Sequence, residues 1–315
     1  MTFTLPRDEV FAADIRSSLA EFPNKLTPTL RPSVSILAAD PGKCLRSHLV
    51  EVSSRFGERD WRRTVRLGTL VEVLHAATLL HDDIIDRAAI RRGRPSAHTV
   101  VGHESAVLAG AALLAAAGQE AAELGTGVSR LFATTVADLA HGELLDVERA
   151  FDVGFESDSY IDVARHKTSA LFRLSCVLGA GAAGVDEDTV LAVAGYGAGL
   201  GVAFQIADDC MDFRTEPGNK PLGTDHLLGL FGLPTLCALR SGADDLRELL
   251  MKPDLGLADL PAIRSIVLAS GGLDQAMEVA RTVYRDAVTS LGDLTGTAAG
   301  AALVATGEAL WRQWM

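Results

Sequence analysis

Two long apolar segments, each ending in a group of aspartates, dominate the pattern of hydrophobic and polar positions along this chain. Between residues 61 and 86, apolar side chains recur every three or four positions, the spacing of one face of an α-helix. Residues 189–207 contain no charged side chain. The first segment ends in Asp-Asp-Ile-Ile-Asp at 82–86, and the second in Asp-Asp-Cys-Met-Asp at 208–212. We expect two long helices with carboxylates at their C-terminal ends.

The rest of the chain also shows helical spacing. Further helices are predicted over residues 8–21, 104–124 and 128–149, and from Ser157 onward, with Ser157 and Asp158 as the candidate caps of the last. Hydrophobic residues make up 48% of the 315 residues and aromatic residues only 5%, with many Ala, Leu and Gly, which favours close-packed helices over a β-sandwich. No linker and no repeat beyond the acidic motif is visible. We therefore predict an all-α fold with a single domain over residues 1–315.

The aspartates stand where helix stability disfavours them. Near a helix C-terminus, a carboxylate meets the negative end of the helix dipole. Asp82 and Asp86 are four residues apart and share a face, so they repel each other unless a cation lies between them. Hard oxygen ligands with room for water and phosphate suit magnesium. For this motif alone, a solvated acidic helix end is the alternative.

The second acidic motif favours the metal interpretation. Gln205, Asp208 and Asp212 lie on one helical face, at positions i, i+3 and i+7. If the two helix ends face each other across a cavity, their carboxylates can hold a cluster of magnesium ions bridged by a diphosphate. The candidate metal ligands are Asp82, Asp83, Asp86, Asp208, Asp209 and Asp212.

Basic residues near the first acidic motif indicate a phosphate-containing ligand. Arg91 and Arg92 follow that motif in a predicted loop, Arg-Arg-Gly-Arg-Pro. Lys43 and Arg46 are three residues apart and lie on one side of the helix predicted to follow them. His75 lies two turns below the aspartates, within reach of an anion at the same cavity mouth. Solvated surface cations and a structural histidine are the alternatives.

Charge and cysteine content exclude several other classes of function. The formal net charge of -12 argues against nucleic acid and anionic membranes as partners. The four cysteines show no metal-ligand or redox spacing, and we read them as buried thiols in a reducing cytoplasm. No signal peptide is evident. Residues 189–207 are long enough to span a membrane, but their glycines and the lack of flanking Lys or Arg favour a buried core helix.

Together the motifs resemble those of the trans-isoprenyl diphosphate synthases, the polyprenyl synthetase family, over most of the chain from residue 41 to about residue 280. The resemblance implies the isoprenoid synthase fold, a single large helical bundle around a central cavity. It also implies a prenyltransferase that condenses isopentenyl diphosphate with an allylic diphosphate head-to-tail (1'-4) into an all-trans polyprenyl diphosphate. The matching elements are Gly-Lys-x-x-Arg at 42–46, the two acidic motifs, Arg-Arg-Gly-x-Pro at 91–95, Gly-Glu at 142–143, Lys-Thr at 167–168, Phe-Gln at 204–205 and the Lys220 loop.

Residue roles follow from the resemblance, position by position. It implies three magnesium ions bound with the allylic diphosphate, ligated by Asp82, Asp86 and Asp208 and supported by Asp83, Asp209 and Asp212. The allylic diphosphate would contact Arg91, Lys167, Thr168, Gln205 and Lys220, and isopentenyl diphosphate would contact Lys43, Arg46, His75 and Arg92. The residues counted as catalytic are Asp82, Asp86, Asp208, Lys167 and Lys220.

Product length depends on the residues below the first acidic motif. Ala77 and Thr78 are small, whereas short-chain family members tend to carry aromatic groups there, so we predict a product of geranylgeranyl length or longer. Replacing Ala77 by Phe is expected to shorten it. The chain departs from the usual family pattern at Cys44 in place of Arg, Ala111 in place of Asp, Asp146 in place of Gln and Leu230 in place of Lys.

Alternative functions remain at this stage. A class I terpene cyclase shares the fold and the acidic magnesium site but needs no second diphosphate site. A non-catalytic subunit of a heteromeric synthase usually lacks the acidic motifs, both of which are intact here. A catalytic subunit that is inactive without its partner is the third alternative. We expect a cytoplasmic homodimer with no integral membrane segment.

Overall fold

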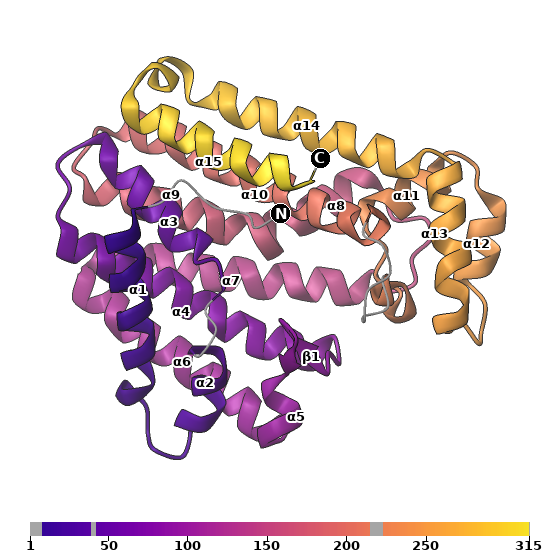
Figure 1. The fold of residues 1–315 in the computed structure, drawn as a ribbon, viewed down its shortest axis with the longest axis horizontal. Coiled ribbons are helices and arrows are strands. Elements are labelled where there is room, and N and C mark those ends of the chain that lie inside the picture. The colour runs from indigo at the N-terminus through magenta and orange to yellow at the C-terminus, as the bar shows by residue number, and fades with distance from the viewer. Residues whose placement is uncertain (1–7, 39–41, 215–222, 315) are drawn as a thin grey trace. The chain divides into compact units, whose positions relative to one another are not determined.

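A computed structural model describes residues 8–38, 42–214 and 223–314 of the chain, without the side chains of residues 33, 36–38 and 314 (Figure 1). Its secondary structure is almost entirely helical, which confirms the predicted all-α fold. The first part contains α1 Glu9–Glu21, η1 Phe22–Lys25, α2 Arg31–Ala38, α3 Leu45–Ser53, η2 Ser54–Phe56, α4 Trp61–Ile85, β1 Ile90–Arg91, β2 Arg94–Pro95, α5 Ala97–Val101, α6 His103–Leu124 and α7 Thr126–Glu148. The second contains α8 Ser157–Ala164, η3 Arg165–Ser169, α9 Ala170–Ala182, α10 Glu187–Arg214, η4 Thr224–Leu228, α11 Leu233–Arg240, α12 Asp244–Leu250, η5 Leu257–Asp259, α13 Leu260–Ala269, α14 Gly272–Ser290, η6 Gly292–Gly296 and α15 Ala298–Trp314.

The helices form two compact units. Unit 1 comprises Met1–Val136, Leu171–Ala194 and Leu291–Thr306, and unit 2 comprises Ala137–Ala170, Gly195–Ser290 and Gly307–Met315. Helices α7, α10 and α15 each contain residues of both units. The single domain expected over residues 1–315 stays a prediction.

Unit 1 is built on α4, which packs against α1, α3 and α6 (Figure 1). The side chain of Asp60 caps this helix by accepting a hydrogen bond from the backbone N–H of Arg63 at 3.0 Å. Helices α4 and α6 come very close at Gly110, which faces the ring of His81. A Cβ atom at residue 110 would lie only 2.8 Å from the ring's Cδ2, so glycine permits this approach. Leu67, Leu70 and Leu74 on α4 are almost fully buried, as their spacing predicts.

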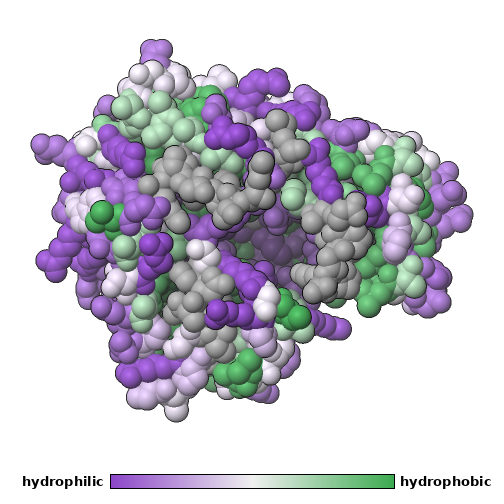
Figure 2. All heavy atoms as spheres, viewed as in Figure 1, coloured by the Kyte–Doolittle hydropathy of each residue, from purple (hydrophilic) through white to green (hydrophobic). Residues whose placement is uncertain are grey.

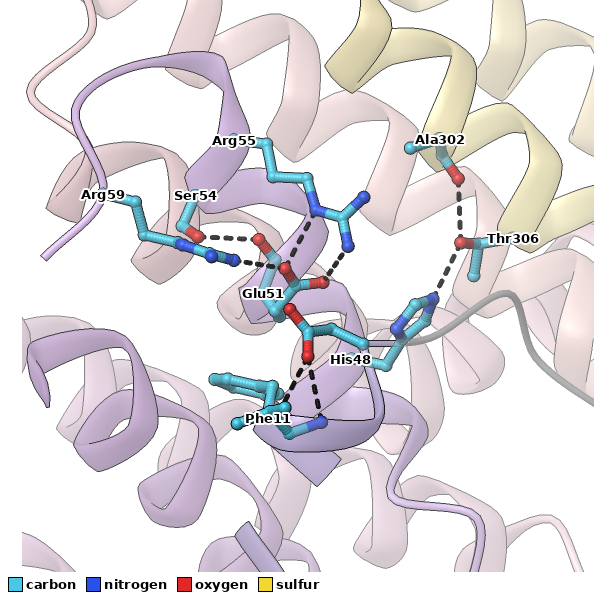
Figure 3. Close-up of polar contacts among 10 residues, drawn as sticks. Phe11, His48, Glu51, Ser54, Arg55, Arg59, Ala302 and Thr306 are labelled. Atoms are coloured by element: carbon cyan, nitrogen blue, oxygen red, sulfur yellow. Dashed lines mark hydrogen bonds and ion pairs between the residues drawn. The ribbon is translucent and has the colours of Figure 1, made fainter. Parts of the chain in front are cut away.

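A buried carboxylate at the end of α3 pairs with two arginines that follow it in the chain (Figure 3). The carboxylate of Glu51 is inaccessible to solvent and accepts two hydrogen bonds from the guanidinium of Arg55, at 2.9 and 2.7 Å, and one from Arg59 at 2.5 Å. On the neighbouring turn, His48 Nε2 lies 3.0 Å from Thr306 Oγ1. These bonds satisfy polar groups that would otherwise be costly to bury, and they set the position of the helix that follows Lys43.

Unit 2 has its own hydrophobic core, to which the C-terminal part of α10 contributes. Ile206, Cys210 and Phe213 of α10 are buried together with Phe231 and residues of α11 and α14. Helix α11 packs on α14, and α12 and α13 pack beside each other. On the face seen in Figure 2, hydrophobic side chains gather over α12 and α13. Exposed hydrophobic residues in this part of the chain are Met251 after α12, Leu257 of η5 and Leu268 of α13.

The structure differs from the predicted elements at two places. The expected loop at 91–95 is part of a two-stranded hairpin in which Arg91 pairs with Arg94, and Arg92 and Gly93 both have positive φ in the turn. The sequence Arg-Gly is a weaker hairpin signal than Asn-Gly or Asp-Gly, so the strands were not predicted. Neither Ser157 nor Asp158 caps α8, because Glu156 occupies the N-cap position and its side chain makes no capping bond.

Two helices, α6 and α10, are long and apolar enough to cross a membrane by length and composition alone. In the structure, 39% of the most apolar stretch of α6 and 56% of that of α10 are buried within the protein. Core helices of globular proteins pass the same test, so this is weak evidence for a membrane segment. The burial of Tyr196, Leu200 and Ile206 agrees with the predicted core role of α10.

Candidate functional site

The first acidic motif lies at the end of α4 in unit 1. Asp86 is the C-cap residue, and its backbone N–H donates to the carbonyl of Asp82 at 2.8 Å. The next residue, Arg87, has φ of 51°, so the chain leaves the helix through a left-handed residue. Asp82 and Asp86 are partly exposed, whereas Asp83 is only 2% exposed. The motif therefore has two outer carboxylates and one inner carboxylate.

The hairpin after α4 supplies a cation to the inner carboxylate. Arg91 Nε donates to Asp83 Oδ1 at 2.7 Å, and its Nη2 forms an ion pair with the same oxygen. The other oxygen, Asp83 Oδ2, is buried without a hydrogen-bond partner. Arg91 was predicted to contact the allylic diphosphate, and the structure places it on Asp83. A ligand can share this guanidinium only from the nitrogen atoms that do not face Asp83.

The cations predicted for isopentenyl diphosphate gather in unit 1. The guanidinium of Arg92 lies against Gly42, where a Cβ atom would be 2.6 Å from its Cζ, so only glycine fits. The guanidinium of Arg46 lies over the ring of Phe172, 5.2 Å from its centroid. Burial and the positive charges of Arg46, Arg92 and Arg91 hold the pKa of His75 well below its usual value. Lys43 is exposed at the start of this segment.

Glu72 belongs to the same cluster of charges, and the sequence analysis missed it. Its carboxylate accepts a hydrogen bond from Ser47 N at 2.8 Å, which caps the N-terminus of α3 from outside the helix. Burial raises the pKa of Glu72, against the opposing effect of Arg46 and of Arg92. One signal was available, because Glu72 lies three residues before His75 on the predicted helix. An apolar cavity adjoins Glu72, His75 and Arg92, and its other walls are Leu19, Phe22, Val34, Val73, Ala76, Leu79 and Leu113.

The second acidic motif lies in unit 2 and also has one inward-facing carboxylate. Asp209 accepts hydrogen bonds from Tyr160 Oη at 2.6 Å, from Gln205 Nε2 at 2.9 Å and from Leu233 N at 3.3 Å. Burial raises the pKa of Asp209 to about 7 and outweighs these donors, which favour the charged form. Asp208 is exposed and Asp212 partly exposed. Gly232 permits this packing, since a Cβ there would lie 2.7 Å from Asp209 Oδ2.

A π-helical turn presents the Lys-Thr pair. The turn, η3, covers Arg165–Ser169 between α8 and α9, and such turns often mark functional positions because they re-aim side chains. Gly142 of α7 allows the turn to pack closely, since a Cβ there would lie 2.7 Å from the carbonyl carbon of His166. Thr168 Oγ1 donates to Gln205 Oε1 at 2.5 Å, so the structure joins two predicted ligand contacts. Gln205 in turn donates to Asp209.

Lys167 is held by two carboxylates of α7. Its Nζ lies 2.7 Å from Asp146 Oδ2 and 3.0 Å from Glu143 Oε2. Arg149 donates to Asp146 Oδ1 from Nε at 2.6 Å and to the carbonyl oxygen of Phe231 at 2.7 Å. Arg149 and Tyr160 were not predicted as partners of these groups, because neither lies in a motif. Tyr160 reaches Asp209 from a distant part of the chain, whereas Arg149 joins Asp146, three residues before it, to the distant carbonyl of Phe231.

The remaining predicted residues are placed as follows. Lys220 lies outside the described residues. Ala77 is fully buried, and Thr78 is partly exposed and donates its hydroxyl to the carbonyl of His75 at 2.9 Å. The chain-length role of this pair stays a prediction.

The outer aspartates suit a magnesium ion that is shared with a ligand. Within residues 8–38, 42–214 and 223–314, no group of three or more His, Cys, Asp or Glu side chains is arranged to hold a metal. Mg²⁺ often binds through only one or two carboxylates, with water and substrate phosphates filling its other positions. The partly exposed outer carboxylates and the buried, unpaired Asp83 Oδ2 fit that mode of binding.

Comparison with known proteins identifies the relatives of this chain. The sequence profile described as polyprenyl synthetase matches residues 27–263. A nonaprenyl diphosphate synthase of Mycobacterium tuberculosis is 33% identical and aligns over 94% of this chain and 93% of its own length. A heptaprenyl diphosphate synthase component 2 of Geobacillus stearothermophilus is 32% identical over 75% of this chain and 74% of its own. The crystal structure of a Caulobacter crescentus polyprenyl synthase complexed with calcium and isoprenyl diphosphate superposes with a TM-score of 0.88 at 28% identity, covering 96% and 94%.

The raised pKa of Asp209 predicts a pH-dependent stability. The folded protein keeps this carboxyl protonated up to about pH 7, whereas in the unfolded chain it ionises near its ordinary value of about 4. The stabilisation is therefore complete at low pH and is lost as the pH rises through about 7. We expect thermal unfolding without metal to show this loss, and the Asp209→Asn variant to lack it. An identical pH profile for both proteins would contradict the prediction.

Proposed function

Because the chain belongs to the polyprenyl synthetase family and is a trans-polyprenyl diphosphate synthase of the isoprenoid synthase fold, we propose that its two acidic motifs bind the allylic diphosphate through Mg²⁺, and that the cations around His75 bind isopentenyl diphosphate. The proposed metal ligands are Asp82, Asp86 and Asp208, with three ions as the family resemblance implies. Lys167, Gln205, Thr168, Arg91 and Lys220 are proposed for the allylic diphosphate, and Lys43, Arg46, His75 and Arg92 for isopentenyl diphosphate.

The observation that carries this proposal is the cluster of cations in unit 1. After burial, the positive charges of Arg46, Arg92 and Arg91 all lower the pKa of His75, so three cations act on the same imidazole. Such a cluster is suited to a second diphosphate, which a terpene cyclase does not need. The calcium and isoprenyl diphosphate named for the Caulobacter crescentus structure support a site for a divalent cation and a diphosphate in this family.

The reaction needs charge stabilisation and an arrangement of the reactants, not a protein nucleophile. When the allylic carbon–oxygen bond ionises, negative charge develops on the departing diphosphate, and Lys167 would stabilise it. Bound magnesium would supply Lewis-acid stabilisation of the same charge. Arg46 and Arg92 would hold isopentenyl diphosphate so that its double bond attacks the allylic cation, and a proton is then lost, in our proposal to the departed diphosphate.

The enzymatic activity of variants at the outer aspartates tests the proposed metal site. The purified chain is incubated with Mg²⁺, labelled isopentenyl diphosphate and a set of allylic primers. We expect Asp82→Asn and Asp208→Asn each to lower kcat/KM by about 100-fold or more, because each removes a ligand of the ions that stabilise the leaving group. Asp188→Asn, an exposed position on the same helix as Asp208, should have wild-type activity.

The same assay separates the alternative functions. Full activity of both variants would refute the metal site. A cyclic hydrocarbon formed from the allylic substrate alone would favour a cyclase. Absence of elongation with every primer would refute synthase activity of the isolated chain.

The product is proposed to have geranylgeranyl length or more. The small side chains of Ala77 and Thr78 support this, as do the heptaprenyl and nonaprenyl products named for two relatives. Ala77 is fully buried, so a large side chain there would overpack the core. Overpacking lowers the free energy of unfolding by about 1–3 kcal/mol. Thr78 is partly exposed and is the better position for a test.

Enlarging Thr78 should shorten the product. We expect Thr78→Phe to shift the products measured by chromatography toward shorter chains, because the ring would lie one turn below Asp82 in the path of the chain. Thr78→Val keeps the volume and should leave the distribution unchanged. A Thr78→Phe enzyme with wild-type products would remove this residue from the determinants of length.

The homodimer is proposed to form through α6. Val107 and Leu108 are 45% and 60% exposed, and Ala111 continues their row one turn on. A second copy covering this row would explain why so apolar a helix is only partly buried. In the proposed cytoplasmic location, this exposed apolar row would be covered by the second copy and not by lipid.

A charge in this row should separate the subunits. Leu108→Arg is expected to convert a dimer into a monomer in analytical ultracentrifugation, since an unpaired guanidinium would be buried at the interface. Leu191→Arg, also at an exposed leucine, serves as the control and should remain dimeric. A monomeric wild-type chain would overturn the proposal, and binding of that monomer to lipid vesicles would favour a membrane role for α6.

A further inference from the structure

We infer that Asp146 is a positioning residue that restrains Lys167 and so weakens the binding of the allylic diphosphate. The inference rests on the proposed contact between Lys167 and that diphosphate. It assigns a function to a position where this chain carries Asp in place of the usual Gln.

The contacts of Lys167 show the restraint. Its ammonium lies between Asp146, at 2.7 Å, and Glu143, at 3.0 Å. The side chains of Asp146 and Glu143 are 8% and 15% exposed, whereas that of Lys167 is 24% exposed. The cation is thus nearer to solvent than its two anionic partners. It can be approached by a ligand without displacement of either carboxylate.

Asp146 itself cannot follow Lys167 toward a ligand. Its Oδ1 accepts a hydrogen bond from Arg149 Nε at 2.6 Å and forms an ion pair with Arg149 Nη2, also at 2.6 Å. Arg149 is buried, donates to the carbonyl of Phe231 and lies over the rings of Phe155 and Tyr160. The fixed partner is therefore the carboxylate, and the movable partner is the lysine, which has four side-chain methylene groups.

The charges of this cluster already balance. Lys167 and Arg149 supply two positive charges, and Glu143 and Asp146 supply two negative charges. Burial opposes ionisation of Asp146, but Lys167 and Arg149 together hold its pKa below the usual value, so it is charged at neutral pH. An arriving diphosphate must therefore compete with Asp146 for Lys167. An uncharged residue at position 146 would remove that competition.

The consequence for the reaction is a weaker hold on both the substrate and the released diphosphate. A single charge within a few ångströms at a partly buried site changes affinity by about fivefold to tenfold. The effect should act on the allylic diphosphate and on inorganic diphosphate. It should not act on isopentenyl diphosphate, whose proposed cations are Lys43, Arg46 and Arg92.

The test compares Asp146→Asn with wild type in the full-length enzyme. Asn keeps an oxygen acceptor for Arg149 but removes the charge beside Lys167. We expect the KM for the allylic diphosphate to fall about fivefold, the KM for isopentenyl diphosphate to stay the same, and the Kd for inorganic diphosphate with Mg²⁺, measured by calorimetry, to fall by a similar factor. Glu143→Gln removes the other anionic partner without touching Arg149, and it should shift the same quantities in the same direction.

Two controls keep the inference separate from its premise. Glu148→Gln removes an exposed charge from the same helix and should leave both KM values unchanged. Lys167→Met should raise the KM for the allylic diphosphate, and if it does not, the proposed role of Lys167 fails first. If Lys167→Met has its effect but Asp146→Asn and Glu143→Gln leave the allylic KM and the diphosphate Kd unchanged or raised, the inference is overturned. Thermal unfolding of each variant identifies a loss of folding, in which case Glu143→Gln decides the outcome.

Discussion

Repulsion between carboxylates at helix C-termini is the constraint on which the rest of this structure depends. Each acidic motif places three aspartates within five residues, where the helix dipole adds to their mutual repulsion. In both motifs the structure turns the second aspartate inward and supplies it with donors. Asp83 receives Arg91 from the hairpin, and Asp209 receives Tyr160, Gln205 and the backbone of Leu233. The outer aspartates, which are exposed or partly exposed, are the ones proposed above to ligate a shared cation.

The cationic side chains of the candidate site are also paired with groups of opposite charge. Positive side chains that are proposed to bind diphosphates lie beside carboxylates that are more deeply buried than they are. Glu72 lies close to Arg46 and Arg92, and Asp146 and Glu143 hold Lys167. Each cation thus keeps its position when no ligand is bound. The buried carboxylates also lower the net positive charge of each cluster.

The sequence predicted the fold class and the family because both depend on local spacing and on motifs. Helical periodicity predicted α4, α6, α7 and α10 to within a few residues. The shared face of Asp82 and Asp86 stays a prediction from their spacing. The close approach of the Arg92 guanidinium to Gly42 joins two motifs that are far apart in the sequence. Glu72 and Tyr160 escaped prediction because their partners come from other elements, and Arg149 escaped because its bond to the carbonyl of Phe231 joins distant parts of the chain. The sequence shows that Glu72 lies in an apolar helix, but it does not show that Glu72 caps the N-terminus of α3.

The two acidic motifs look alike in sequence but are held by different physical interactions. Asp83 is paired with a full positive charge from Arg91, whereas the nearest donors of Asp209 are a phenol, an amide and a backbone N–H, all uncharged. Neutral donors do not outweigh burial, which is why the pKa of Asp209 is raised to about 7. A cation near Asp208 would therefore meet an inner carboxyl that can give up a proton, and binding there would be linked to pH. At the first motif, by contrast, the charge of Arg91 already balances that of the inner carboxylate, so the two inner carboxyls differ in charge environment although their sequences match.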